Sequence, residues 1–408
     1  MEVPTSMDLP GYSPSAPVPD YSSKPLPGEK CIQKTPRHPS YDHGDCSFTY
    51  QEHSMSLTLR GCREEDGVPA FGLCSTVHGE FEPINRDKIV SVVVKLEGRI
   101  LLKGRSQTMA HVLFSKEHLL WKRSGSAESA CPSLLPLTIS FPATYRDAQN
   151  DRSLRLPPSV IIGRPRRAAV AYSLNIIVQK TKSALFSRKT REVRMSAHLC
   201  YRPRVRPPRP APICFSGLKF CPDEWQEEIW AMSKGTSGGD RQALTAQCHF
   251  FLPSVRVFAT GEAIPFHLSF FSSISFLRNV MSHISPQTDD VIAIEHPIHV
   301  FLLRQTTVHT KGSKTIHEEV IGTGAISPNP TTVVDAVYPD NPLTMSWDGE
   351  LRCETPVEHT GFTTAALEVK DYMVLSLIVP PGPLKSIPPN LHHTIPIRLV
   401  THPWIDRS

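Results

Sequence analysis

The sequence lacks the spacing patterns that mark common metal sites and enzyme motifs. Its ten cysteines include no Cys-x-x-Cys pair. The closest group, Cys200, Cys214 and Cys221, has gaps that fit no usual zinc module. There is also no Gly-x-Ser-x-Gly elbow, no phosphate-binding glycine loop and no His-Glu-x-x-His. We therefore expect reduced thiols, no metal, no cofactor and no enzymatic activity.

Long hydrophobic runs are missing as well. The longest runs, 89–94 and 372–379, are far shorter than the ~18–20 residues that a membrane-spanning helix needs. The N-terminus has no basic region followed by an apolar stretch, so we expect no signal peptide. The net charge is only +5, and aromatic residues do not interleave with the basic ones, which argues against nucleic-acid binding. These features predict a soluble intracellular protein.

Glycine is scarce and proline abundant, at 22 and 39 residues, which is typical of many short strands joined by proline-marked turns. From about His53, apolar residues recur at every second position, the period of half-buried strands. Apart from one expected helical turn at 115–121, we find no sustained helical period. In the first half the alternating runs are Met55–Leu59, Val92–Leu96, Leu135–Phe141, Val170–Val178 and Val193–Tyr201.

A proline- and arginine-rich connector, 202–212, interrupts this alternation because proline removes donors from a strand ladder. A polar stretch with one expected short helix, Asp223–Met232, follows, and alternation then resumes to the end. Within it, Trp347–Glu350 predicts a tight hairpin, since Asp-Gly tolerates positive φ. The sequence thus predicts an all-β protein with two antiparallel β-sandwich domains of immunoglobulin-like type. The expected boundaries are 46–210 for the first domain, 211–243 for a linker and 244–408 for the second domain.

Residues 1–45 are rich in proline and poor in apolar residues, which predicts a disordered tail. Two phrases in this tail read apolar-Pro-x-Tyr, and WW domains bind such proline-rich segments in the polyproline II form. A solvated tail with incidental tyrosines would look similar. The candidate docking residues are Leu9, Pro10 and Tyr12 in the first phrase, and Val18, Pro19 and Tyr21 in the second.

The order and spacing of several segments resemble those of the arrestin family, specifically the fungal α-arrestins that act as trafficking adaptors. The segments are Leu96–Gly104, Leu135–Pro142, Leu156–Ser159, Val170–Val178, Leu199–Pro208 and Thr260–Phe266. The resemblance covers roughly residues 50–405. It implies two arrestin-like sandwiches that link membrane-protein cargo to a WW-domain HECT ubiquitin ligase for ubiquitination and endocytosis. The implied location is the cytoplasm, at the periphery of the plasma membrane or endosomes. An arrestin- or retromer-like sorting scaffold without a ligase link is the alternative.

Basic residues concentrate in one segment. Residues 163–210 hold thirteen Lys and Arg side chains against one acid, Glu192. One interpretation is a basic face for anionic lipid headgroups or acidic cargo tails. The other is a solvated strand edge that its charge protects from aggregation. The candidate residues are Arg164, Arg166, Arg167, Lys180, Lys182, Arg188, Lys189 and Arg191.

Overall fold

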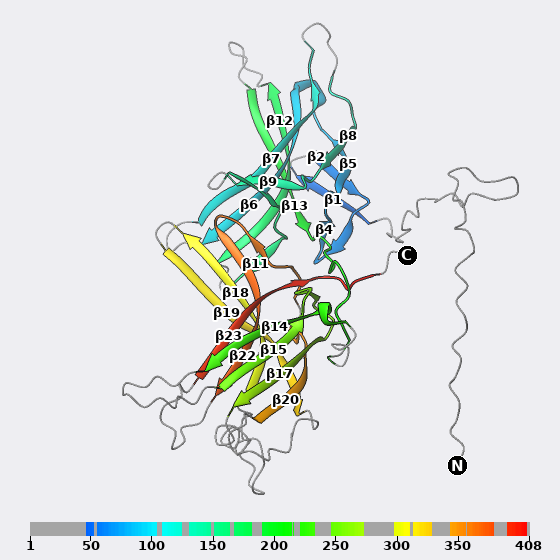
Figure 1. The fold of residues 1–408 in the computed structure, drawn as a ribbon. Coiled ribbons are helices and arrows are strands. Elements are labelled where there is room, and N and C mark those ends of the chain that lie inside the picture. The colour runs from blue at the N-terminus through cyan, green and yellow to red at the C-terminus, as the bar shows by residue number, and fades with distance from the viewer. Residues whose placement is uncertain are drawn as a thin grey trace, which may run out of the picture. The chain divides into compact units, whose positions relative to one another are not determined.

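The alternating runs form strands, and the computed structural model is built almost entirely from them (Figure 1). The structure describes residues 46–52, 55–103, 108–124, 130–147, 151–163, 167–181, 190–213, 215, 221–232, 246–272, 298–310, 313–328, 343–355, 357–378 and 390–405. These residues contain no α-helix. Among the described residues, the helical elements longer than one residue are two short 3-10 helices, η1 (Arg86–Lys88) and η3 (Pro222–Glu224). The expected tail 1–45 lies outside the described residues.

The first half of the chain forms two layers. One layer is a four-stranded antiparallel sheet in the order β1 (Ser47–Glu52), β2 (Met55–Arg60), β5 (Thr76–Glu82) and β8 (Leu135–Ser140). The other is a seven-stranded sheet in the order β3 (Arg63–Glu65), β4 (Val68–Phe71), β13 (Thr190–Tyr201), β12 (Ala168–Thr181), β6 (Ile89–Lys103) and β7 (Thr108–Lys122), with β11 (Val160–Ile162) paired to β12. β9 (Thr144–Asp147) and β10 (Arg152–Arg155) form a separate hairpin.

The core of the first half lies between these layers, as the alternation predicts. Tyr172, Leu174 and Ile176 on β12 are fully buried, whereas Ser173 and Asn175 between them are only half-buried. The Tyr172 ring packs against Phe141 and Tyr201, and its hydroxyl donates a hydrogen bond of 2.5 Å to the carbonyl of Pro157. The buried aromatic side chains therefore join β12 and β13 to the residues that follow β8.

The second half folds as one ten-stranded sheet that curls on itself. Its order is β14 (Trp225–Met232), β15 (Ala246–Pro253), β17 (Ile264–Ser272), β20 (Leu343–Leu351), β19 (Ser313–Pro328), β18 (Ile298–Thr310), β22 (Leu367–Ile378), β23 (Asn390–Val400) and β16 (Val257–Ala259), with β21 (Phe362–Thr363) paired to β22. β19 makes the curl, because it pairs with β18 up to Thr323 and with β20 from Gly324 onward. This arrangement is consistent with the predicted tandem β-sandwiches.

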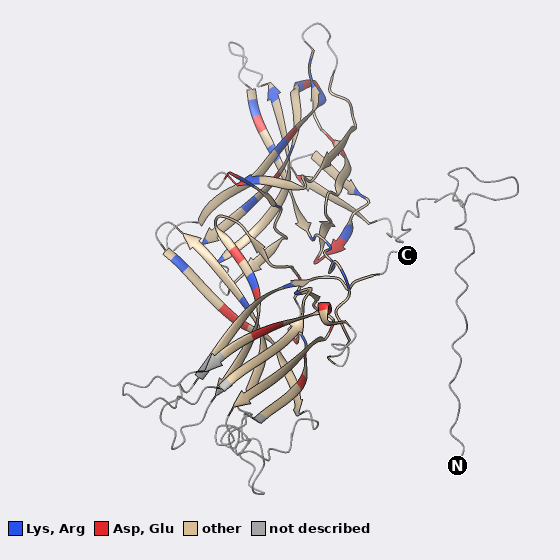
Figure 2. Ribbon diagram, viewed as in Figure 1, with Lys and Arg blue, Asp and Glu red and all other residues tan. Residues whose placement is uncertain are grey.

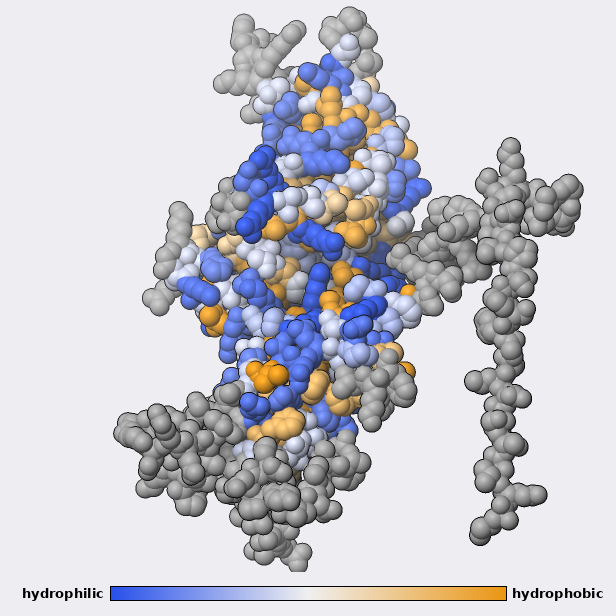
Figure 3. Space-filling view, viewed as in Figure 1, coloured by the Kyte–Doolittle hydropathy of each residue, from blue (hydrophilic) through white to orange (hydrophobic). Residues whose placement is uncertain are grey.

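A second core fills the curl of this sheet. Phe250, Phe266, Leu268 and Trp347 are almost completely buried in it. Residues 45–408 form one compact unit, and Leu367 from the second half packs into the first core. On the face drawn in Figure 3, hydrophobic residues stand in small groups among hydrophilic ones.

Three local predictions are wrong. The expected helix Asp223–Met232 is instead the turn η3 followed by strand β14, which pairs along its whole length with β15. The expected helical turn at 115–121 lies inside β7, whose backbone pairs with β6. The expected hairpin Trp347–Glu350 is part of the continuous strand β20, which pairs with β17 and β19. In each case pairing with a neighbouring strand overrides the local preference.

Candidate functional site

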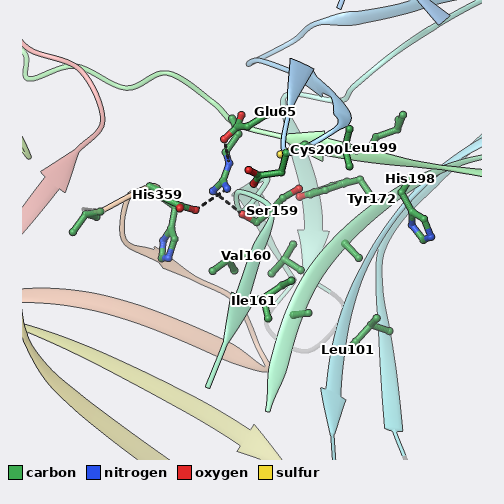
Figure 4. A pocket seen from close by; sticks show the side chains of 18 of the residues that line it. Glu65, Leu101, Ser159, Val160, Ile161, Tyr172, His198, Leu199, Cys200 and His359 are labelled. Carbon is green, nitrogen blue, oxygen red and sulfur yellow. Dashed lines mark hydrogen bonds and ion pairs between the residues drawn. The ribbon is translucent and has the colours of Figure 1, made fainter. Parts of the chain in front are cut away.

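Arg202, the first residue after β13, makes polar contacts with both halves of the chain. Its backbone N–H donates to the carbonyl of Phe71 at 2.8 Å, which fixes where the side chain starts. Its guanidinium donates to three acceptors: Glu65 Oε1 at 2.8 Å, the Ser159 carbonyl at 3.1 Å and Glu358 Oε2 at 2.9 Å (Figure 4). The planar fork of arginine can make these contacts at the same time.

The acceptors come from three distant segments. Glu65 ends β3, just before the Asp66–Gly67 turn, and Glu358 lies between β20 and β21. Ser159 precedes β11 and makes two hydrogen bonds with Tyr201. The Ser159 N–H donates to the Tyr201 carbonyl, and the Tyr201 N–H donates to Ser159 Oγ, both at 2.8 Å. Arg202 therefore ties the end of β13 to both halves of the chain.

A cavity of about 930 Å³ opens beside this network. One wall is formed by residues of β6, β11, β12 and β13, and the other by residues of β18 and β19 together with residues 355 and 357–359. Ile161 on β11 lines this cavity and is 57% exposed. The apolar lining residues are Leu101, Val160, Ile161, Ala169, Ala171, Leu199, Ile321 and Val357.

A smaller cavity of about 190 Å³ shares four lining residues with the large one: Glu65, Arg202, Glu358 and His359. The side chains of the Arg202 network thus border both spaces. Any change in the Arg202–Glu358 contact would alter both cavities.

A buried ion pair supports the wall that carries Glu358. Arg304 on β18 binds Asp371 on β22 with two hydrogen bonds, Nε to Oδ1 at 2.7 Å and Nη2 to Oδ2 at 3.1 Å. Arg304 Nη1 also donates to the carbonyl of His359 at 3.3 Å. Burial, together with the cations of Arg304 and Arg202, lowers the pKa of His359 to about 4. His359 is therefore neutral at pH 7.

The charges that line the large cavity are mostly acidic. Four carboxylates, those of Glu65, Asp66, Glu319 and Glu358, face two guanidinium groups, those of Arg202 and Arg304. Burial alone would lower the pKa of Arg202, but neighbouring Cys200 and the two bound carboxylates outweigh it and raise the pKa above its ordinary value. An apolar wall with a charged rim can hold an extended peptide segment with apolar side chains.

The structure describes three of the predicted basic residues and separates them into two places. Arg167 is exposed before β12, whereas Lys180 lies near the other end of β12, directly opposite Arg191 on β13. Arg164, Arg166, Lys182, Arg188 and Lys189 lie outside the described residues, as do the docking residues Leu9, Pro10, Tyr12, Val18, Pro19 and Tyr21. Sequence reasoning missed the Arg202 network, because its partners come from distant segments.

The described residues show neither a membrane-spanning helix nor a metal-binding cluster. None of their helical elements is long and apolar enough to cross a membrane. Within the same residues, no group of three or more His, Cys, Asp or Glu side chains could hold a metal ion.

Comparison with known proteins identifies no family. The sequence matches no protein-family model and no curated protein. The resemblance to arrestins therefore stays a prediction.

Proposed function

We propose that the chain is a non-enzymatic trafficking adaptor that links membrane-protein cargo to a WW-domain HECT ubiquitin ligase for ubiquitination and endocytosis. The proposal rests on the order of the arrestin-like segments and on the two tail phrases. The observation that carries it is the combination of those phrases with a folded region that has a large cleft between its two cores.

The cleft is the proposed cargo-binding surface. An extended cytoplasmic segment of a transporter or receptor would place apolar side chains on the wall that includes Ile161 and Leu101. Its backbone and polar groups would face the charged side chains near Arg202. The area that such a segment buries would supply most of the affinity, because apolar burial contributes about 25 cal/mol per Å².

The tail phrases are the proposed ligase-binding surface. Each offers a proline that pre-sets the polyproline II conformation and a tyrosine two residues later, which together suit the aromatic grooves of a WW domain. Two phrases on one strand, Leu9–Tyr12 and Val18–Tyr21, can engage two modules of the same ligase and gain avidity.

A pull-down with the full chain on beads tests the proposal. The purified WW-domain region of a HECT ligase should bind the wild-type chain, and Pro10→Ala combined with Pro19→Ala should remove most of the binding by releasing φ. Pro25→Ala with Pro27→Ala is the matched control, because these prolines stand in the same tail without a tyrosine two residues later. If both double variants bind the ligase equally well, the sorting scaffold without a ligase link becomes the better proposal.

A further inference from the structure

Six basic side chains from four segments meet at one end of the first sandwich. We call this group the basic end, and Figure 2 shows Lys and Arg residues at the ends of β12 and β13 there. The segments are η1, the end of β7 with the residue after it, the end of β12 and the start of β13. The six residues are Arg86, Lys88, Lys122, Arg123, Lys180 and Arg191.

Hydrogen bonds between these segments hold the basic end together. Lys180 Nζ donates to the carbonyl of Ile84 at 3.5 Å, and the hydroxyl of Thr181 donates to the carbonyl of Lys88 at 3.3 Å. The Arg123 backbone N–H donates to the carbonyl of Val90 at 2.9 Å, and its guanidinium donates to the carbonyl of Asp87. The cations are thus placed by strand ends rather than by a single stretch of sequence.

Two acidic residues lie among these cations, Asp87 in η1 and Glu192 next to Arg191, and Glu192 pairs with Arg194. The basic end therefore keeps an excess of positive charge within the described part of the chain. None of the six side chains forms an ion pair with an acidic side chain there. Lys180 and Arg191 stand directly opposite each other, an arrangement that destabilises a strand pair. Burial and then the charge of Arg191 lower the pKa of Lys180. A bound anion would relieve this repulsion.

An exposed apolar side chain, that of Ile84, also lies at the basic end. The turn between β5 and β6 carries Ile84, which is 50% exposed, and its backbone carbonyl accepts the hydrogen bond from Lys180. The next residue, Asn85, adopts a left-handed conformation with φ of 57° and directly precedes η1. Ile84 thus lies two residues before Arg86, in a turn that Lys180 contacts, so an exposed apolar side chain adjoins cations of the basic end.

We propose that the basic end docks on an anionic lipid bilayer, with Ile84 entering the headgroup layer and the cations contacting lipid phosphates and carboxylates. Basic side chains near an anionic membrane attract it, and apolar side chains strengthen such contacts by burial at the interface. An acidic peptide would match the charges but would leave Ile84 without a partner. The biological role of this contact rests on the proposed adaptor function. Because lipid binding is measured without a ligase, the lipid-docking inference and the adaptor proposal can each fail without the other.

Vesicle co-sedimentation of the full chain tests this inference. The wild-type chain should bind vesicles of phosphatidylcholine with phosphatidylserine, should bind phosphatidylcholine vesicles much less, and should release as salt rises. Lys88→Gln with Arg191→Gln should weaken binding about 25-fold, since each cation near the surface contributes about fivefold. Ile84→Asp should weaken it as well.

Matched controls distinguish the effect of the basic end on vesicle binding from the effects of net charge and of an exposed apolar side chain elsewhere. Lys116→Gln with Lys314→Gln removes the same charge from exposed residues elsewhere, and Val112→Asp changes a side chain that is 57% exposed on β7. Both controls should bind like the wild type. The inference is overturned if the wild-type chain does not bind the anionic vesicles, or if the basic-end variants and the control variants behave alike. Poly-glutamate serves as the acidic-peptide probe in the same assay, and the inference is also overturned if the basic-end variants weaken binding to poly-glutamate but not to the anionic vesicles.

Discussion

Arg202 and Glu358 are 156 residues apart in the sequence, yet their side chains meet at 2.9 Å. Arg202 is half-buried, with a side chain 19% exposed, whereas the Glu358 side chain is 68% exposed. The contact links the end of β13 to the segment between β20 and β21. The two ends of this ion pair should therefore respond very differently to substitution.

Arg202→Ala should destabilise the protein by about 1–3 kcal/mol, because three acceptors lose their donor in a half-buried site. Glu358→Gln should cost much less, since an exposed carboxylate is well hydrated without its partner. Arg146→Ala removes an exposed arginine of the Arg146–Asp151 pair and serves as the control. Urea denaturation measures all three. Equal effects of Arg202→Ala and Arg146→Ala would contradict a structural role for the network.

Stability should fall as the pH drops from 7 to 5, in part because of His359. Its pKa is about 4 in the folded protein and 6.5 in its ordinary state, so the unfolded chain binds the extra proton first. Between pH 6.5 and pH 5 this difference amounts to about 2 kcal/mol at most. His359→Gln should flatten the pH dependence of the denaturation midpoint relative to the wild type. Parallel pH profiles for the two proteins would show that His359 titrates normally.

Gly349→Ala should destabilise the second sandwich. Gly349 on β20 stands opposite Phe266 on β17, and a Cβ atom added there would collide with the Phe266 ring and lie 2.7 Å from the carbonyl oxygen of Ala325. Overpacking of this kind costs about 1–3 kcal/mol. At Gly261 an added Cβ meets no atom within 4 Å, so Gly261→Ala is the control and should change the thermal midpoint little. Similar midpoints for both variants would refute the close packing of Gly349.

The strands could be predicted from the sequence, because burial on one face imposes a period of two. The alternation at Tyr172, Leu174 and Ile176 predicted which side chains are buried, and the structure confirms it. Turns were less predictable. The dipeptide Asp66–Gly67 forms a true turn with positive φ at both residues, while Asp348–Gly349 lies inside a strand. Local chemistry cannot distinguish a glycine that a turn requires from one that a facing ring requires.

The candidate sites were less predictable than the strands. The basic run 163–210 drew attention to Lys180 and Arg191, but Arg86, Lys88 and Lys122 join them only through strand pairing. The acceptors of Arg202 are equally invisible in sequence, since no local pattern relates Glu65 to Glu358. Sites assembled from long-range contacts need the fold before they can be recognised.

The central claim, that the tail recruits a ligase, is tested most directly by calorimetric titration of the full chain with a tandem WW-domain fragment of a HECT ligase. Tyr12→Ala or Tyr21→Ala alone should weaken binding by about tenfold or more, because the remaining phrase binds without avidity. The double variant should lose measurable binding while its thermal midpoint stays that of the wild type. A double variant that binds the fragment as tightly as the wild-type chain would contradict the account.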